Sequence, residues 1–229
     1  MLRAALLIAS KDLRLVAVRG AGLVQALLLG LLLIFLFSLA GGAGDRLPPH
    51  GAAVVFWLST AFCLVLIFHA LYSLEETDGA RQGLLLSPIP IQAVWLGKAL
   101  AGFLLLLAAQ VLFLAATVAF LGHEPSGPWL WGLVTLLAVN WGLVVLGSLL
   151  GAVAQGQAAR ESLLSIILFP LLVPLLLAGV RVGAAVFGGK DAEGLGSSLG
   201  SWLGITLAFG AIYSAAGLVL FPHAYGGEE

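Results

Sequence analysis

Residues 71–100 read LYSLEETDGARQGLLLSPIPIQAVWLGKAL, a charged segment placed between two strongly apolar blocks. The polar part begins at Glu75 and ends at Gly83, and Pro88 and Pro90 close it. Because the blocks on both sides are apolar enough to lie in lipid, this segment has to face water. The stretch therefore predicts two membrane-crossing helices that are joined by a short polar connection.

The composition of the whole chain extends this interpretation. Of its 229 residues, 61% are hydrophobic and 9% are charged, and the mean hydropathy is +1.13. Soluble domains carry about 25% charged residues, so we expect an all-α polytopic membrane protein. The net charge of −1 excludes the basic footprint of a nucleic-acid-binding protein.

Six apolar blocks are long enough to cross the hydrocarbon layer, which takes about 20 residues of helix. We expect the six transmembrane helices at about residues 21–40, 52–74, 91–121, 129–154, 162–187 and 198–222. The connections between them are short, so residues 1–229 are predicted to form a single transmembrane domain. An even number of spans puts both termini on the same side of the membrane.

The basic residues indicate which side that is. With the N-terminus inside, seven basic residues fall in inner segments: Arg3, Lys11, Arg14, Arg19, Arg81, Lys98 and Arg160. The outer segments hold three: Arg46, Arg181 and Lys190. Because basic residues are enriched in cytoplasmic segments, both termini are predicted to be cytoplasmic, and so is the connection at residues 75–90.

Residues 1–19 are predicted to form an amphipathic helix that lies in the cytoplasmic membrane interface. Its apolar stripe, at spacings of three and four, consists of Leu2, Leu6, Ala9, Leu13 and Val16. The largely opposite face carries Arg3, Ser10, Lys11 and Arg14. A secretory signal cleaved at Ser38-Leu39-Ala40 is the alternative, but the apolar run before that site is longer than the usual signal core of about 7–15 residues.

No residue pattern points to catalysis by this chain. Gly188-Gly189-Lys190-Asp191 lacks the leading glycine and the hydroxyl residue of a phosphate loop, so ATP hydrolysis would have to occur on a partner chain. The four histidines show no metal-ligand spacing, and we assign neither a metal nor a bound cofactor. No carboxylate falls in the middle of a span, which argues against coupling to an ion gradient.

A few polar side chains and backbone features inside the spans remain as candidates. His69, Gln110 and Asn140 are candidates for substrate contacts or interhelical hydrogen bonds. Pro170 and Pro174 are expected to bend the fifth span, because each removes an N–H and clashes with the carbonyl one turn earlier. Static packing and a moving element both stay open for this bend. Close-packing faces are offered by three glycine sets: Gly147 and Gly151, Gly179 and Gly183, and Gly196, Gly200 and Gly204.

Two stretches together resemble the CcmB family, the membrane subunits of the haem-exporter-type ABC transporter of cytochrome c maturation. The first is residues 71–100, where the family's pattern is occupied by Glu75, Glu76, Asp78, Gly79, Leu84 to Leu86, Pro88, Pro90, Gly97 and Lys98. The second is residues 164–174, LSIILFPLLVP, which is similar to the family's FPxxxP segment.

This resemblance implies a six-helix permease of the ABC-2 exporter type in the bacterial inner membrane. It implies a separate CcmA-like ATPase, CcmC-like and CcmD-like membrane proteins and a CcmE-like haem chaperone as partners, with haem as a transported or partner-bound ligand. A homodimer stays open. Residues 75–90 would be the coupling segment that docks on the ATPase, with its interface at Glu75, Glu76, Asp78, Gly79 and Arg81. Residues 1–19 would be the connecting helix at the membrane surface.

Two other functions stay open on the sequence. An ABC-2 permease for a lipid, a polysaccharide or a drug would share the same fold and the same coupling. A membrane scaffold without transport activity would need no ATPase. Within the first function, haem export and ATP-driven release of a haem-loaded chaperone are both compatible with the residues.

Overall fold

The computed structural model describes residues 1–40, 47–77, 80–154, 158–189 and 196–226. Within these ranges the description leaves out the side chains of residues 21, 74–77, 80, 81, 85, 158–169, 196–198 and 226. Several residues singled out from the sequence therefore lie outside the described residues: Arg46, Asp78, Gly79 and Lys190.

Throughout these described ranges the regular structure is helical. The elements are α1 (Leu2–Arg19), α2 (Ala21–Ala40), α3 (Pro49–Thr77), α4 (Ala80–Leu85), α5 (Ile91–Ala116), the π-helix η1 (Thr117–Leu121), α6 (Trp129–Ala154), α7 (Ala158–Gly188) and α8 (Gly196–Gly226). Six of the described helical segments are long and apolar enough to cross a membrane: Gly22–Ala40, Pro49–Ser73, Ile91–Leu121, Trp129–Ala154, Pro170–Gly188 and Leu199–Tyr225. The prediction of an all-α polytopic membrane protein with six spans is confirmed.

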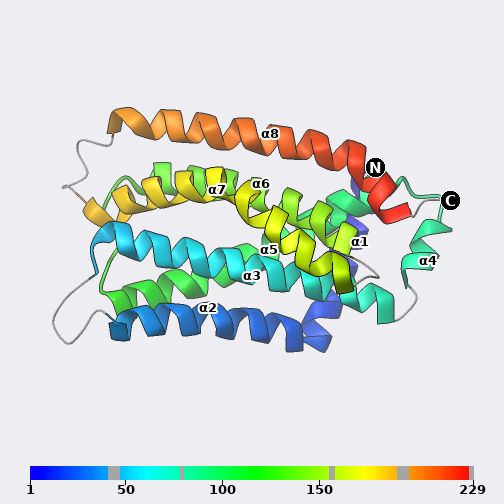
Figure 1. Cartoon of the computed structure of the whole chain (residues 1–229), viewed down its shortest axis with the longest axis horizontal. Coiled ribbons are helices and arrows are strands. Elements are labelled where there is room, and N and C mark those ends of the chain that lie inside the picture. The colour runs from blue at the N-terminus through cyan, green and yellow to red at the C-terminus, as the bar shows by residue number, and fades with distance from the viewer. Residues whose placement is uncertain (41–46, 78–79, 155–157, 190–195, 227–229) are drawn as a thin grey trace.

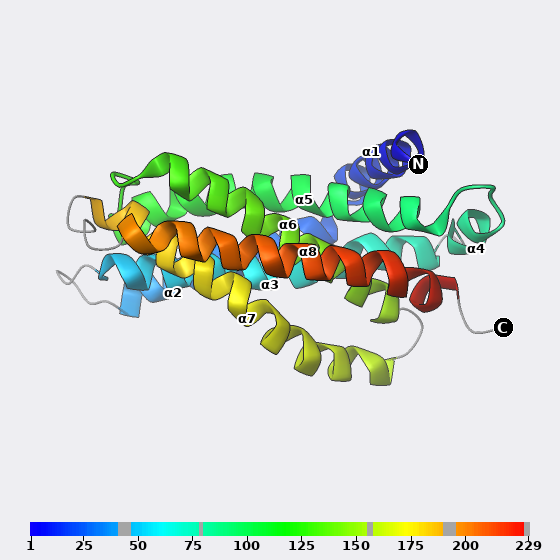
Figure 2. The same ribbon diagram turned by 90° about the horizontal axis from the view of Figure 1, so that it is seen from above.

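The long helices run along one axis and form an elongated bundle (Figure 1). α1 crosses this axis at one end of the bundle, beside the beginning of α5 (Figures 1 and 2). α4 and the C-terminal end of α8 lie at the same end of the bundle. We refer to it as the α4 end, and it gathers the N-terminal helix, the charged connection and the last turns of α8.

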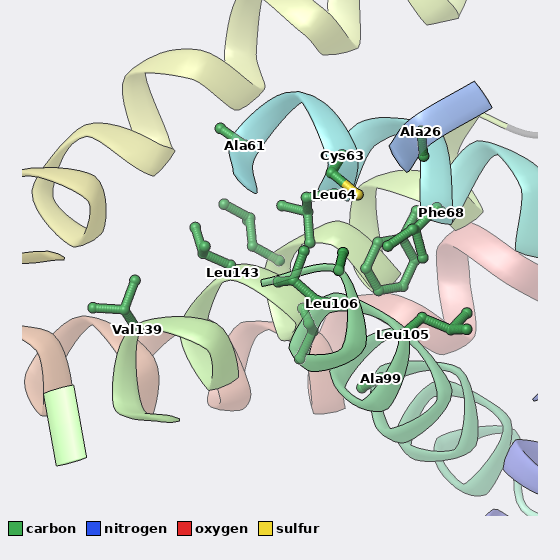
Figure 3. Close-up of a cluster of buried hydrophobic side chains, with 14 of the residues drawn as sticks. Ala26, Ala61, Cys63, Leu64, Phe68, Ala99, Leu105, Leu106, Val139 and Leu143 are labelled. Atoms are coloured by element: carbon green, nitrogen blue, oxygen red, sulfur yellow. The ribbon is translucent and has the colours of Figure 1, made fainter. Parts of the chain in front are cut away.

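The core lies around α3, α5 and α6. α3 packs against α2, α5 and α7, and α6 packs against α7 and α8. Figure 3 shows apolar side chains from four helices meeting in this core, among them Ala26, Phe68, Leu106 and Leu143. In the most apolar 18-residue stretch of α3, 67% of the residues are buried, against 17% in α2 and 22% in α8. α2 and α8 are therefore the peripheral spans, whose outer faces remain for lipid or for other subunits.

Glycines of α5, α6 and α7 make room for aromatic rings of α3. A Cβ atom would lie 2.5 Å from the Phe68 ring at Gly102 and 2.6 Å from it at Gly147. One turn further along α6, a Cβ at Gly151 would lie 2.5 Å from the Tyr72 ring. In α7, a Cβ at Gly179 would lie 2.4 Å from the Trp57 ring, whereas one at Gly183 would lie 3.3 Å from both Ala53 and Trp57. Gly200 and Gly204 have open space around them in the described structure, so that part of the third set does not pack within this chain.

Replacing Gly147 by alanine is expected to destabilise the bundle. The new methyl group would overlap the Phe68 ring, which also lies against Gly102, and overpacking of this kind costs about 1–3 kcal/mol. The matched control is Gly204→Ala, because the space at Gly204 is open. Thermal unfolding in detergent should show a lower midpoint for Gly147→Ala only, and equal midpoints for the two variants would contradict this packing.

Candidate functional site

The charged connection forms a protruding turn at the α4 end. α3 continues to Thr77, and the short helix α4 follows at Ala80–Leu85. The Leu86 N–H donates to the Gln82 carbonyl at 3.1 Å, and the Ser87 hydroxyl donates to the Leu84 carbonyl at 2.7 Å. α5 then begins at Ile91, directly after Pro90. The described part of the connection after α3, residues 80–90, therefore consists of a short helix and a hydrogen-bonded turn that leads into α5.

Of the residues predicted for the coupling interface, Asp78 and Gly79 lie outside the described residues. Glu75 and Glu76 lie in the last turn of α3, and Arg81 lies in α4; their side chains are outside the described set. Of the described neighbours, Gln82 is exposed, and Leu86 exposes 88% of its surface.

Directly beneath this turn lies a buried charge pair between α1 and α5. The carboxylate oxygen Oδ2 of Asp12 is 3.5 Å from Nζ of Lys98, and the two side chains expose 3% and 0% of their surface. The other carboxylate oxygen of Asp12 lies 3.0 Å from Nζ of Lys11, which is partly exposed. Buried charges occur in proteins when they are paired, so Lys98 and Asp12 fix α1 on α5.

Lys98 also binds the end of α3. Its ammonium group donates to the Leu71 carbonyl at 3.1 Å and lies 4.3 Å from the centre of the Tyr72 ring. The Tyr72 hydroxyl donates to the Ser148 carbonyl of α6 at 2.6 Å. Lys98 thus connects α1, α3 and α5 directly and α6 through Tyr72. We call the set Asp12, Leu71, Tyr72, Lys98 and Ser148 the Lys98 junction.

A glycine allows α1 to approach α5 closely enough for this pair. A Cβ atom at Gly97 would lie 2.8 Å from the Ala5 carbonyl oxygen and 2.8 Å from the Ile8 Cβ. Any larger residue at Gly97 would push α1 away and separate Asp12 from Lys98. The sequence Gly97-Lys98 therefore combines a close backbone contact with a charge that can reach across it.

The buried face of α1 differs from the stripe that the sequence predicts. The buried residues are Ala5, Ile8, Ala9, Asp12 and Val16, whereas Leu2 and Leu6 expose 68% and 53% of their surface. The helix has two apolar faces, one against α5 and one turned outward. Asp12 was missed as a site residue because the helix was treated only as a membrane-surface element; the lone acid in a basic helix was the available signal.

Gln110 and Asn140 form a reciprocal pair in the middle of the bundle. Gln110 Nε2 donates to Asn140 Oδ1 at 3.0 Å, and Asn140 Nδ2 donates to Gln110 Oε1 at 2.6 Å. Both side chains are buried, and Gln110 Nε2 also reaches Thr60 Oγ1 of α3 at 3.4 Å. This geometry joins α3, α5 and α6 and occupies both amide groups, so it makes interhelical contacts and leaves little hydrogen-bonding capacity for a substrate.

His69 lies elsewhere. Its side chain is exposed on the surface of α3, and it makes no hydrogen bond to the described part of the chain. It is therefore separate from the Gln110–Asn140 pair and from the Lys98 junction. Across the described residues there is also no group of three or more His, Cys, Asp or Glu side chains close enough to hold a metal ion.

The two prolines lie inside α7, which stays helical through both. Figure 2 shows α7 bending along its length, so that its N-terminal part diverges from α8. Near the bend, the Tyr213 hydroxyl of α8 donates to the Leu171 carbonyl at 2.6 Å. Each proline removes the hydrogen bond to the carbonyl four residues earlier, at Ile166 and Pro170, so the Tyr213 contact ties α8 to the bent region without replacing either lost bond.

Comparison with known proteins places the chain in a family. The family profile described as CcmB protein matches residues 3–222. The chain belongs to the CcmB family. Among its relatives, the heme exporter protein B of Rhodobacter capsulatus is 31% identical over 220 residues, which covers 94% of this chain and 93% of the relative. The protein of the same name from Pseudomonas aeruginosa is 30% identical over 213 residues, covering 93% and 95%.

In this CcmB-family chain, the amide pair gives a direct test of the core. Gln110→Leu should destabilise the protein because it leaves the buried Asn140 amide without its main partner. The double variant Gln110→Leu/Asn140→Leu should recover part of the loss, since neither position then holds an unsatisfied amide. A double-mutant cycle of thermal stability should give a coupling of about 1 kcal/mol, and strictly additive losses would contradict the pairing.

Proposed function

We propose that this chain is the permease subunit of an ABC transporter that acts in cytochrome c maturation and is driven by a separate CcmA-like ATPase. The observation that carries this proposal is the match to the CcmB family over residues 3–222. Relatives that this chain covers almost completely are named heme exporter protein B. The six-span fold supports the ABC-2 exporter type, in which the membrane subunit does not catalyse a reaction and ATP is bound by the partner.

In this proposal residues 75–90 are the coupling segment that docks on the ATPase. The segment is folded, lies at the end of the bundle and exposes Leu86, while Glu75 and Glu76 give it acidic charge. α3 ends within this segment, at Thr77, and α5 begins directly after it, at Ile91. A force applied to the segment therefore acts on two central helices. Asp78, Gly79 and Arg81 complete the interface.

The proposed orientation puts the α4 end in the cytoplasm of a bacterium, with the chain in the inner membrane. The excess of basic residues in the inner segments supports it, and α1, α4 and the end of α8 lie together at this end of the bundle. The exposed Trp129 and Trp131 at the start of α6 fit the opposite membrane interface.

For the work that the ATPase drives, we infer release of a haem-loaded CcmE-like chaperone rather than passage of haem through this chain alone. Apolar side chains of α3, α5 and α6 pack against one another (Figure 3), and the Gln110–Asn140 pair joins α5 to α6 deeper in the bundle. CcmC-like and CcmD-like proteins would then hold the haem. The apolar outer faces of α2 and α8 offer surfaces for these subunits, for membrane lipid or for a second copy in a homodimer.

Reversing the charge of the coupling segment tests its assignment. The variant Glu75→Lys/Glu76→Lys/Asp78→Lys should lose most of its bound ATPase and most of its cytochrome c maturation, because acidic contacts become repulsive. ATPase retention is measured by co-purification in mild detergent, and maturation by haem staining of c-type cytochromes.

The matched control reverses three acidic residues in loops predicted at the other end: Glu124→Lys/Asp191→Lys/Glu193→Lys. This control should retain the ATPase. If the variant at residues 75–78 keeps both ATPase binding and maturation at the level of the unchanged protein, the coupling assignment is wrong.

The bend of α7 is proposed to flex when the ATPase closes. Pro170→Ala/Pro174→Ala should straighten and stiffen the helix and lower maturation at least several-fold, while the amount of protein in the membrane and its ATPase binding stay unchanged. Maturation at the normal level in this variant would reduce the prolines to a packing role.

A further inference from the structure

We propose that Lys98 and Asp12 are positioning residues that make α1, α3 and α5 move as one unit when the coupling segment is displaced. This inference rests on the proposed function, because it assumes that an ATPase acts on residues 75–90. It goes further by assigning a role in force transmission to a buried ion pair and to the N-terminal helix.

Lys98 lies close to both helices from which the coupling segment emerges. Lys98 lies about two turns into α5, and the Leu71 carbonyl that it binds lies less than two turns before α3 ends at Thr77. The segment 75–90 leaves the bundle from α3 and returns through α5. Lys98 therefore joins its two ends inside the protein, just below the surface on which a partner would press.

The energetics of buried ion pairs carry the next step. Removing both charges from water is costly, and apolar residues of similar volume often give equal or higher stability at such places. Stability alone therefore gives no reason for Lys98, which is completely buried, or for Asp12, which is 3% exposed. The pair fixes the positions of α1 and α3 against α5, since the Lys98 ammonium group contacts Asp12 of α1, the Leu71 carbonyl of α3 and the Tyr72 ring.

The contact between Asp12 and Lys98 is longer than a hydrogen bond between well-matched partners. Its Oδ2 atom is buried and has no hydrogen-bond partner within the described structure, although Lys98 Nζ lies 3.5 Å away. The ammonium group lies closer to the Leu71 carbonyl, at 3.1 Å. If α1 slid along α5, the distance between Asp12 and Lys98 would change directly. The strength of the pair therefore depends on the relative position of the two helices.

The test separates packing from positioning by replacing the ion pair with apolar residues. Asp12→Leu/Lys98→Met keeps the volume and leaves no unpaired buried charge. We expect this double variant to insert in the membrane and to co-purify with the ATPase like the unchanged protein, while cytochrome c maturation falls at least tenfold. Lys11→Met is the control, because Lys11 contacts Asp12 from the partly exposed side, and it should mature cytochromes normally.

Normal maturation by Asp12→Leu/Lys98→Met would overturn the inference and reduce the pair to packing. If that variant does not accumulate in the membrane, Lys98→Arg decides instead. It keeps the charge, but the planar guanidinium cannot take the same position between Asp12 and Leu71. Reduced maturation with normal ATPase binding then supports the inference, and unchanged maturation overturns it. Absence of ATPase from the unchanged protein would contradict the proposed function rather than this role.

Discussion

Hydrocarbon offers no hydrogen-bond partner to a polar group, and several of the polar side chains inside this bundle bond to another helix. Three such contacts organise the structure. Lys98 joins α1, α3 and α5 at the α4 end, Gln110 and Asn140 join α5 and α6 at mid-membrane, and Tyr213 joins α8 to the bent part of α7. Between them, glycines of α5, α6 and α7 receive aromatic rings of α3. α3 is therefore the central helix on which the others are arranged.

These contacts lie at successive depths along the bundle, starting from the α4 end. The charged segment 75–90 lies at one end, and the Lys98 junction lies directly below it. Deeper in the bundle, the amide pair joins α5 to α6 and reaches Thr60 of α3. In the proposed function, α3 and α5 would carry a displacement of the α4 end inward. The bend of α7 lies beside this central group, and Leu172 and Leu175 next to it are fully buried.

Much of this could be predicted from the sequence because membrane spans are read from long-range hydropathy. Block length and composition gave the six spans, and the motifs at residues 71–100 and 164–174 pointed to the family. Gln110 and Asn140 stood out as polar residues within apolar blocks, but their pairing needed the rotation of two helices about their axes. Asp12 was not found for a related reason. Its burial depends on which of the two apolar faces of α1 meets α5, and that is decided by the close contact at Gly97, not by the periodicity of α1.

We propose that residues 75–90 receive force from a separate ATPase. The most direct test places a photo-crosslinking benzoylphenylalanine at Gln82, which is exposed on α4, and, as the control, at Trp131, which is exposed near the start of α6. We expect Gln82 to crosslink to the ATPase with a yield that changes between ATP-bound and nucleotide-free membranes, and Trp131 not to crosslink to it. A Gln82 variant that supports cytochrome c maturation but crosslinks to no ATPase in either state would contradict the account.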